Sequence, residues 1–206
     1  MKISYAITVC NEIEEVQRLI SHLAEHKREE DEIIVLQDIN NLHVELTEKL
    51  QKLRYDGTIT LQGDYFDGHF ADWKNKLKEL CTGDYIFQID ADELPTQDLI
   101  ADLPYIVGEN NIDLFLVPRD NKVKGITDAH IQKWGWRVDN LGRINFPDYQ
   151  TRIYKNTPEI KWMNKVHERI TGYDTFSNFP AEETWCLYHP KHIERQEKQN
   201  ELYSKI

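Results

Sequence analysis

The 206-residue chain lacks several features that would place it in a specialised class of protein. It has three cysteines, Cys10, Cys81 and Cys186, which are far apart and do not have metal-binding spacing. This pattern argues against a disulfide framework or a cysteine-based metal site, and we expect reduced thiols. No apolar run approaches the roughly 18 residues that a membrane-spanning helix needs. Because the N-terminus leads directly into a strand-like segment, we expect no signal peptide and a cytoplasmic protein.

Positive charge is also scarce. The chain has 25 Lys and Arg against 36 Asp and Glu, a formal net charge of −11, so its overall field repels nucleic acids and anionic lipids. Apolar and aromatic residues are plentiful: 40% of the chain is hydrophobic, including 5 Trp, 10 Tyr and 7 Phe, which indicates an ordered protein. The length suits one domain, spanning residues 1–206, with a substantial core.

Hydrophobic residues alternate between strand and helix periodicity along residues 1–95. Strands are expected at Ile3–Val9, Glu32–Gln37, Thr58–Leu61 and Tyr85–Ile89. Helices are expected over residues 13–23, 42–53 and 70–80. This β-α-β-α-β-α-β order predicts an α/β fold with a mainly parallel central sheet flanked by helices on both faces.

Residues 96–206 have a less regular pattern. We expect a helix at Gln97–Tyr105, strands at Asp113–Pro118, Thr151–Tyr154 and Lys165–Ile170, an apolar strand before His189, and a polar helix from Ile193 through Gln196, Asn200 and Tyr203. Residues 119–147 are polar and contain several glycines, so a long irregular loop is expected there. A loop of that length in a compact domain usually has a function.

Polar residues follow three of the expected strands. Asp90 and Asp92 come directly after the fourth strand, Asp38 ends the second, and Asn11 and Glu12 follow the first. Parallel sheets bind ligands at the carboxyl ends of their strands. Two carboxylates on one side of a strand end suit Mg²⁺ or Mn²⁺ carrying a phosphate. For Asn11 and Glu12 an equally good interpretation is ordinary capping of the next helix, with Asn11 as its N-cap.

Four segments of the first half carry a family resemblance. They are Ile7-Thr-Val-Cys-Asn-Glu12, Asp31-Glu-Ile-Ile-Val-Leu-Gln-Asp38, His69-Phe-Ala-Asp-Trp-Lys-Asn75 and Gly83-Asp-Tyr-Ile-Phe-Gln-Ile-Asp-Ala-Asp-Glu93. In this order they resemble the first strand, the second strand, the third helix and the metal motif of glycosyltransferase family 2. Pro147-Asp-Tyr-Gln-Thr-Arg-Ile-Tyr154 and Lys165-Val-His-Glu168 are similar to a subgroup that includes lipopolysaccharide-core and phage-encoded transferases.

The resemblance implies a GT-A fold and a metal-dependent, inverting glycosyltransferase of the hexosyltransferase type, class EC 2.4. Such an enzyme moves a sugar from a nucleotide-diphosphate sugar, here UDP-linked rather than GDP-linked, to an acceptor hydroxyl. The expected cofactor is Mn²⁺ or Mg²⁺. Residues 1–95 would then form the half that binds the nucleotide sugar, and residues 96–206 the half that binds the acceptor and carries the C-terminal helix.

The resemblance also assigns roles to individual residues. The implied metal-binding residues are Asp92, Asp90 and His189. The implied donor-binding residues are Val9, Asn11, Glu12, Asp38, Lys74, Asn75 and Asp90. Because direct displacement needs a carboxylate to accept the acceptor's proton, we expect Glu168 to be the general base, with Asp148 as a second candidate. The residues expected to contact the acceptor are Trp134, Trp136 and Tyr149.

Two other functions compete with this one. A sugar-phosphate nucleotidyltransferase would keep the fold and the metal, but those enzymes resemble one another in a glycine-rich turn after the first strand, where this chain has Cys10-Asn-Glu-Ile. A non-catalytic module that binds metal or nucleotide would keep the site without using an acceptor. For a transferase, the net charge favours a saccharide, a lipid-linked glycan or a protein as acceptor over a modified DNA base.

Overall fold

The structure is a computed structural model that describes residues 1–40 and 43–197. Leu42, where the second helix was expected to begin, and Asn200 and Tyr203 of the expected C-terminal helix lie outside the described residues. Residues 193–197 are helical, as expected. Within the described ranges, each helix is too short or too polar to cross a membrane. Cys10, Cys81 and Cys186 are all free thiols.

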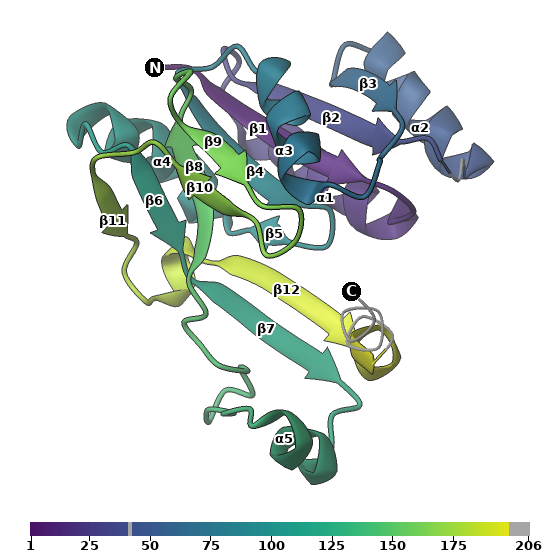
Figure 1. The fold of residues 1–206 in the computed structure, drawn as a ribbon, viewed down its shortest axis with the longest axis vertical. Coiled ribbons are helices and arrows are strands. Elements are labelled where there is room, and N and C mark those ends of the chain that lie inside the picture. Colours follow the sequence, from purple (N-terminus) through teal and green to yellow (C-terminus); the bar gives the residue numbers. More distant parts are fainter. Residues whose placement is uncertain (41–42, 198–206) are drawn as a thin grey trace.

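A seven-stranded sheet forms the centre of the fold, in the order β11-β6-β8-β4-β1-β2-β3 (Figure 1). Neighbouring strands are parallel except at β8, which runs antiparallel to both β4 and β6. The predicted α/β fold with a mainly parallel sheet is therefore confirmed. The strands are β1 (Ile3–Val9), β2 (Glu32–Asp38), β3 (Thr60–Asp64), β4 (Tyr85–Asp90), β6 (Leu114–Val117), β8 (Gln150–Lys155) and β11 (Phe176–Asn178).

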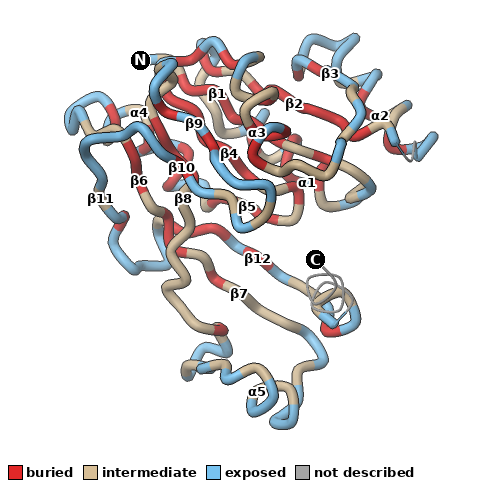
Figure 2. Tube along the Cα trace, viewed as in Figure 1, coloured by how far each residue is buried: buried red, intermediate tan, exposed pale blue. Residues whose placement is uncertain are grey.

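Both faces of the sheet are covered, because successive side chains of a strand point to opposite faces. On one face, Ile3, Tyr5 and Ile7 of β1 pack with α1, α2 and α4. On the other face, Ala6 packs with α3 and with the hairpin formed by β9 and β10. Figure 2 shows β1, β2 and β4 buried along most of their length. The covering elements are α1 (Ile13–His26), α2 (Val44–Tyr55), α3 (Phe70–Glu79), α4 (Gln97–Glu109), β9 (Lys161–Met163) and β10 (Arg169–Thr171).

A second, three-stranded sheet in the order β5-β12-β7 extends away from the central sheet and leads to α5 (Figure 1). In it β12 pairs in parallel with β7 and antiparallel with β5. Its strands are β5 (Leu94–Pro95), β7 (Arg119–Lys124) and β12 (Leu187–His192). The helix α5 (Asp128–Trp134) follows β7, and the 3₁₀ helix Glu183–Trp185 precedes β12.

Three local predictions are wrong. Residues 119–147 are not one irregular loop, because they contain β7 and α5, and β7 is stabilised by pairing with β12 from the far end of the chain. Residues 165–168 form a turn between β9 and β10 instead of a strand. Asn11 does not cap α1. Glu12 holds the N-cap position, and its Oε2 accepts hydrogen bonds from the backbone N–H groups of Cys10 (3.0 Å) and Asn11 (3.1 Å).

Gly83 lies at the close approach between the start of β4 and the start of β1. A Cβ atom at Gly83 would lie 2.7 Å from the backbone nitrogen of Ser4 and 2.9 Å from the carbonyl oxygen of Lys2. The Gly83 N–H also donates to Ser4 Oγ at 2.8 Å. Backbone atoms cannot rotate away as a flexible side chain can, so this position requires glycine.

We expect Gly83→Ala to lower the free energy of unfolding by about 1–3 kcal/mol, because the two strands must move apart to accommodate the methyl group. Urea unfolding measures the change. Gly108→Ala in α4 is the matched control. Among the described residues, no atom outside the neighbouring backbone of α4 lies within 4 Å of a Cβ there, and helix propensity predicts a gain of up to about 1 kcal/mol. Equal effects of the two substitutions would contradict the close approach at Gly83.

Candidate active site

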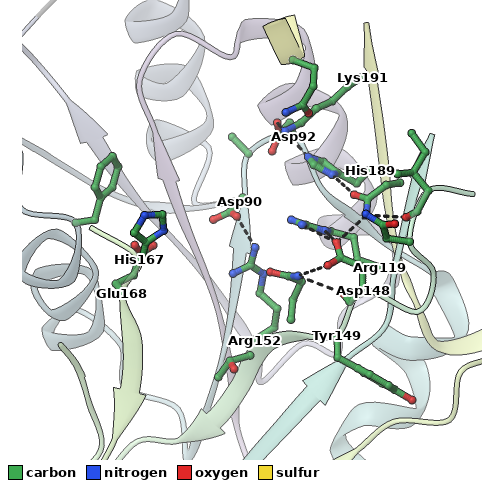
Figure 3. A pocket seen from close by; sticks show the side chains of 18 of the residues that line it. Asp90, Asp92, Arg119, Asp148, Tyr149, Arg152, His167, Glu168, His189 and Lys191 are labelled. Carbon is green, nitrogen blue, oxygen red and sulfur yellow. Dashed lines mark hydrogen bonds and ion pairs between the residues drawn. The ribbon is translucent and has the colours of Figure 1, made fainter. Parts of the chain in front are cut away.

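A pocket of about 810 Å³ lies at the carboxyl ends of β1 and β4 (Figure 3). Its other walls include parts of β7, β8 and β12, the start of α3, the turn between β9 and β10, and the helical residues 195–196. Most of the residues expected in the site line this pocket: Glu12, Lys74, Asp90, Asp92, Trp136, Asp148, Tyr149, Glu168 and His189. Segments far apart in the sequence are thus brought together at one edge of the sheet.

Four of the expected donor-binding residues, Val9, Asn11, Asp38 and Asn75, lie outside the lining of this pocket. The Val9 side chain is buried in the main core, and Asn11 is exposed. Asp38 is buried, and its Oδ1 accepts hydrogen bonds from the backbone N–H groups of Asn40 (2.9 Å) and Phe66 (3.3 Å). Asp38 therefore joins the turns that follow β2 and β3.

Asn75 and Trp134 also lie outside the pocket lining. The Asn75 amide donates to the carbonyl of Trp162 and accepts from its N–H, both at 2.9 Å, which fastens α3 to β9. The Trp134 ring lies against that of Trp136, with 4.6 Å between their centroids, and stacks on His130. Trp134 thus supports Trp136, which does line the pocket.

Asp92 faces a histidine and two basic side chains. Its Oδ2 is 3.4 Å from His189 Nε2, 3.4 Å from Arg195 Nη2 and 3.9 Å from Lys191 Nζ. Burial by itself would raise the pKa of Asp92, but the hydrogen bond and charge that His189 supplies when its ring is protonated, together with the charge of Lys191, lower it to about 2. The Asp92 carboxylate is therefore ionised at neutral pH and lies among groups of opposite charge.

Asp90 is linked to Asp148 through the buried carboxylate of Glu93 and two arginines, Arg152 and Arg119, which Figure 3 shows beside the two aspartates. Arg152 Nη2 donates to Asp90 Oδ2 and, at 2.7 Å, to Glu93 Oε1. Arg119 Nη1 donates to the same Glu93 oxygen at 3.0 Å, while its Nε and Nη2 donate to Asp148 Oδ2 at 2.9 and 2.7 Å. The Glu93 side chain is 0% exposed, so its charge depends on these arginines for compensation.

The pKa values of this group reflect the same contacts. Burial alone would raise the pKa of Glu93, but the charges of Arg152 and Arg119, with the hydrogen bonds from Arg152, lower it well below its usual range. Burial alone would lower the pKa of Arg152, but Asp90 and Glu93 raise it. The Glu93 carboxylate and the Arg152 guanidinium are therefore both charged across the physiological pH range.

Asn121 and His189 continue the chain of contacts to Asp92. Asn121 Nδ2 donates to Asp148 Oδ2 at 2.6 Å, and its Oδ1 lies 2.6 Å from His189 Nδ1. The two aspartates of the Asp-Ala-Asp segment are thus the two ends of one series of polar contacts, which we call the polar chain. Its members are, in order, Asp90, Arg152, Glu93, Arg119, Asp148, Asn121, His189 and Asp92.

Glu168 and Lys74 form a separate pair in the pocket. Lys74 Nζ donates to Glu168 Oε1 at 2.5 Å and lies 4.3 Å from the centroid of the Trp162 ring. Lys74 was expected to contact the donor, and in this structure its partner is the expected general base. Figure 3 shows Glu168 and His167 on the opposite side of Asp90 from Asp148.

Three non-glycine residues that line the pocket have positive φ angles. These are Asn145 (55°), Asp148 (34°) and His167 (53°). Such conformations cost energy for residues with a Cβ atom and persist where the surrounding structure imposes them, often at functional sites. Their presence around one pocket supports a functional role for its walls.

Sequence reasoning did not place Glu93, Arg119, Arg152, Lys191 or Arg195 in the site. Two of them carried a signal, because Glu93 directly follows the Asp-Ala-Asp segment and Arg152 belongs to the segment that resembles a transferase subgroup. The other three carried none. Basic side chains are usually solvent-exposed, and only the pairing of β7 with β12 and the path of the C-terminal helix bring these to the pocket.

The described residues offer a divalent cation only part of a coordination shell. Among residues 1–40 and 43–197, no group of three or more His, Cys, Asp or Glu side chains is placed to hold a metal. Asp92 and His189 supply one carboxylate oxygen and one imidazole nitrogen, 3.4 Å apart. Mg²⁺ takes six ligands and often completes its shell with the oxygens of a phosphate-bearing substrate. Asp92 and His189 would thus supply two of the ligands of such a cation, and the others would have to come from water or from a bound substrate.

Comparison with known proteins identifies a family. The family model described as "Glycosyl transferase family 2" matches residues 4–185. No curated protein sequence gave a significant match. Two solved structures with a similar fold are S. aureus TarS 1–349 in complex with UDP-GlcNAc (TM-score 0.65, 16% identity) and in complex with UDP (TM-score 0.63, 15% identity).

The likeness to TarS shows the fold alone, because the identity is so low. The UDP-GlcNAc complex aligns with 93% of this chain but only 59% of the TarS chain, and the UDP complex with 92% and 60%. This chain thus spans less than two thirds of the length of TarS 1–349.

We expect Glu93→Gln to lower the free energy of unfolding by about 3–5 kcal/mol, because Arg119 and Arg152 would lose the buried carboxylate that compensates their charges. Urea unfolding at neutral pH measures the loss. The matched control is Glu45→Gln on α2, which breaks an exposed pair with Lys49 and should change stability little. Similar unfolding midpoints for the two variants would contradict the role given to Glu93.

The stability difference between the wild type and Glu93→Gln should depend on pH. The pKa of Glu93 is lower in the folded protein than the value of about 4.3 for an unfolded glutamate. Its stabilisation is therefore fully present above that value and is lost as the pH falls through the folded pKa. Urea unfolding of both proteins from pH 7 down to pH 3 tests this, and a difference that stays constant would argue against it.

Proposed function

This chain belongs to glycosyltransferase family 2, and we propose that it is a glycosyltransferase of class EC 2.4 that transfers a sugar from a nucleotide-diphosphate sugar to an acceptor hydroxyl with inversion. The observation that carries the proposal is the position of Asp90 and Asp92. They lie at the carboxyl end of β4, in a pocket that also contains basic side chains and a separate carboxylate, Glu168.

The basic side chains near Asp92 support a diphosphate-bearing donor. Lys191 and Arg195 both line the pocket and lie within 4 Å of the Asp92 carboxylate. Phosphate oxygens bound beside Asp92 would meet these two cations directly. A UDP-sugar is the preferred donor, since TarS, which shares the fold, has been crystallised in complex with UDP-GlcNAc and with UDP.

Asp92 and His189 are the residues that would hold Mn²⁺ or Mg²⁺, with Asp90 close by. When bound, the cation supplies Lewis-acid stabilisation of the negative charge that grows on the departing nucleoside diphosphate. The Asp90 carboxylate is held by Arg152, and its side chain is 36% exposed. This exposure supports a role for Asp90 in contacting the donor or a water molecule beside the cation that Asp92 would hold.

Glu168 is the better candidate for the general base. Asp148 Oδ2 accepts hydrogen bonds from Arg119 and Asn121, and its Oδ1 accepts one from Gln150 at 3.1 Å. Both oxygens of Asp148 are thus occupied. Glu168 is held through Oε1 by Lys74, and its side chain is 20% exposed within the pocket, so it can accept a proton from an acceptor hydroxyl.

The acceptor is assigned to the wall formed by Trp136 and Tyr149. Tyr149 donates its hydroxyl to the carbonyl of Phe179 at 2.9 Å, which fixes the ring in place. An indole face and a fixed phenol ring suit the apolar face of a sugar. We propose a saccharide, a lipid-linked glycan or a protein as acceptor, since the net charge of −11 disfavours modified DNA. The resemblance of residues 147–154 and 165–168 to the lipopolysaccharide-core and phage-encoded subgroup stays a prediction.

The turn after β1 argues against a sugar-phosphate nucleotidyltransferase. That activity would use backbone N–H groups of a glycine-rich turn to bind phosphate. Here the N–H groups of Cys10 and Asn11 already donate to the Glu12 carboxylate, which would also repel a phosphate. A non-catalytic binding module would share the donor site, and it differs from a transferase only in lacking turnover.

Donor binding should be visible as thermal stabilisation. With Mn²⁺, a UDP-sugar at 100 times its Kd should add about 2.7 kcal/mol to the stability of the wild type, because it binds only the folded state. Asp92→Asn should remove the part of this gain that requires Mn²⁺, whereas the exposed-site control Asp174→Asn should keep it. A panel of UDP- and GDP-sugars in which none raises the Tm would contradict the proposed function.

Turnover should depend on Glu168. Glu168→Gln is expected to lower the rate of sugar transfer, or of donor hydrolysis, by about 10²–10⁴-fold, because the amide cannot accept a proton. Its thermal shift with donor and Mn²⁺ should match that of the wild type. Glu159→Gln, at an exposed glutamate before β9, is the control and should retain activity. A fully active Glu168→Gln would exclude this residue as the base, and an inactive wild type that binds donor would favour the binding module.

A further inference from the structure

Asn121 is the member of the polar chain that lies between Asp148 and His189. It pairs with His189 across the parallel strands β7 and β12, so both side chains project from the same face of the small sheet. Its backbone carbonyl accepts from the N–H of Ile144 at 2.9 Å, which fixes the strand at this point. The side-chain amide then contacts Asp148 on one side and His189 on the other.

The partners of Asn121 determine which way its amide points. Nδ2 lies 2.6 Å from a carboxylate oxygen of Asp148 and 3.4 Å from the carbonyl oxygen of Ile144. Both of these groups only accept hydrogen bonds at neutral pH, so the NH₂ group must face them. The flipped amide would bring Oδ1 against the Asp148 carboxylate, two acceptors in contact. Oδ1 is therefore the atom that faces His189.

The orientation of the amide in turn sets the protonation of the imidazole. Oδ1 of Asn121 has no proton to donate, so the 2.6 Å contact requires a hydrogen on His189 Nδ1. In the neutral ring the lone pair is then on Nε2. That nitrogen lies 3.4 Å from Asp92 Oδ2, and the His189 side chain is 6% exposed. Two acceptors thus face each other beside the side chains of Lys191 and Arg195, and a cation or a proton between them would remove their repulsion.

We propose that Asn121 is a positioning residue that holds His189 in the Nδ1–H tautomer, so that the lone pair of Nε2 faces the Asp92 carboxylate and both can bind a divalent cation. The inference rests on the proposed function for the identity of that cation. It also gives the Asn121–Asp148 contact a role, because Asp148, itself held by Arg119, fixes the amide that fixes the imidazole.

Without Asn121 the other tautomer has the advantage. A hydrogen on Nε2 would allow His189 to donate to Asp92 Oδ2, which would satisfy both groups and block the nitrogen that binds the cation. Asn121→Leu removes the acceptor at Nδ1 and should favour that state. Asn121→Asp retains an oxygen facing Nδ1 but loses the NH₂ group that Asp148 accepts from, so it separates the two contacts of the amide.

Nitrogen NMR of the full chain labelled with ¹⁵N-histidine reads the tautomer directly at a pH where His189 is neutral, with the His189 signal assigned by its loss in His189→Gln. We expect Nδ1–H in the wild type and in Asn121→Asp, and Nε2–H in Asn121→Leu. Mn²⁺ binding, followed by electron paramagnetic resonance with UDP present, should be about 10–100-fold weaker in Asn121→Leu. Asn178→Leu, at an exposed position of β11, is the control and should change neither result.

Nε2–H in the wild type, or an Asn121→Leu variant with unchanged tautomer and Mn²⁺ affinity, would overturn the inference. The signals of the other histidines report whether Asn121→Leu is folded, and Asn121→Asp provides a second variant if it is not. A wild type that shows the expected tautomer but binds no Mn²⁺ would overturn the cation role and the metal part of the proposed function together. Tight Mn²⁺ binding with the wrong tautomer would overturn the role of Asn121 alone.

Discussion

The buried carboxylate of Glu93 is the constraint on which the rest of the site depends. A fully buried charge is costly unless it is paired and hydrogen-bonded, and Glu93 receives donors from Arg119 on β7 and Arg152 on β8. These arginines then have donors left for Asp148 and Asp90. The buried charge of Glu93 thus fixes β7 and β8, which belong to different sheets, relative to each other. Through the two arginines it also fixes the carboxylates of Asp148 and Asp90.

The fold of residues 1–95 could be predicted because its signals are local. Each strand there is a short apolar run, each helix has apolar residues at helical spacing, and parallel strands with helical crossovers have few alternative arrangements. The second half could not be predicted as well, because its strands depend on distant partners. β7 is a polar segment that becomes a strand only by pairing with β12, more than sixty residues later, as the pairs Arg119–Leu187 and Lys124–His192 show.

The same distinction applies to the site. Asp90 and Asp92 could be placed from sequence, because a strand end fixes where their side chains go, and both line the pocket with His189 and Glu168. The partners of these residues could not be placed. An arginine or lysine in a polar segment looks solvent-exposed, and nothing local shows that Arg195 meets Asp92 or that Lys74 is held by Glu168. Electrostatic pairing between distant segments is a property of the folded chain.

Residues 125–149, which include α5 and Trp136, connect the end of β7 to the start of β8. Arg119 on β7 and Arg152 on β8 both donate to Glu93, and the N–H of Ile144 donates to the carbonyl of Asn121 on β7, so the stretch between Lys124 and Ile144 begins and ends at fixed points. Lengthening such a closed segment costs little, about 0.6 kcal/mol for each doubling of its length. The part of this segment before Ile144, which carries α5 and Trp136, can therefore change in length at little cost, whereas Asp148 cannot be replaced without losing the contacts with Arg119 and Asn121 in the polar chain.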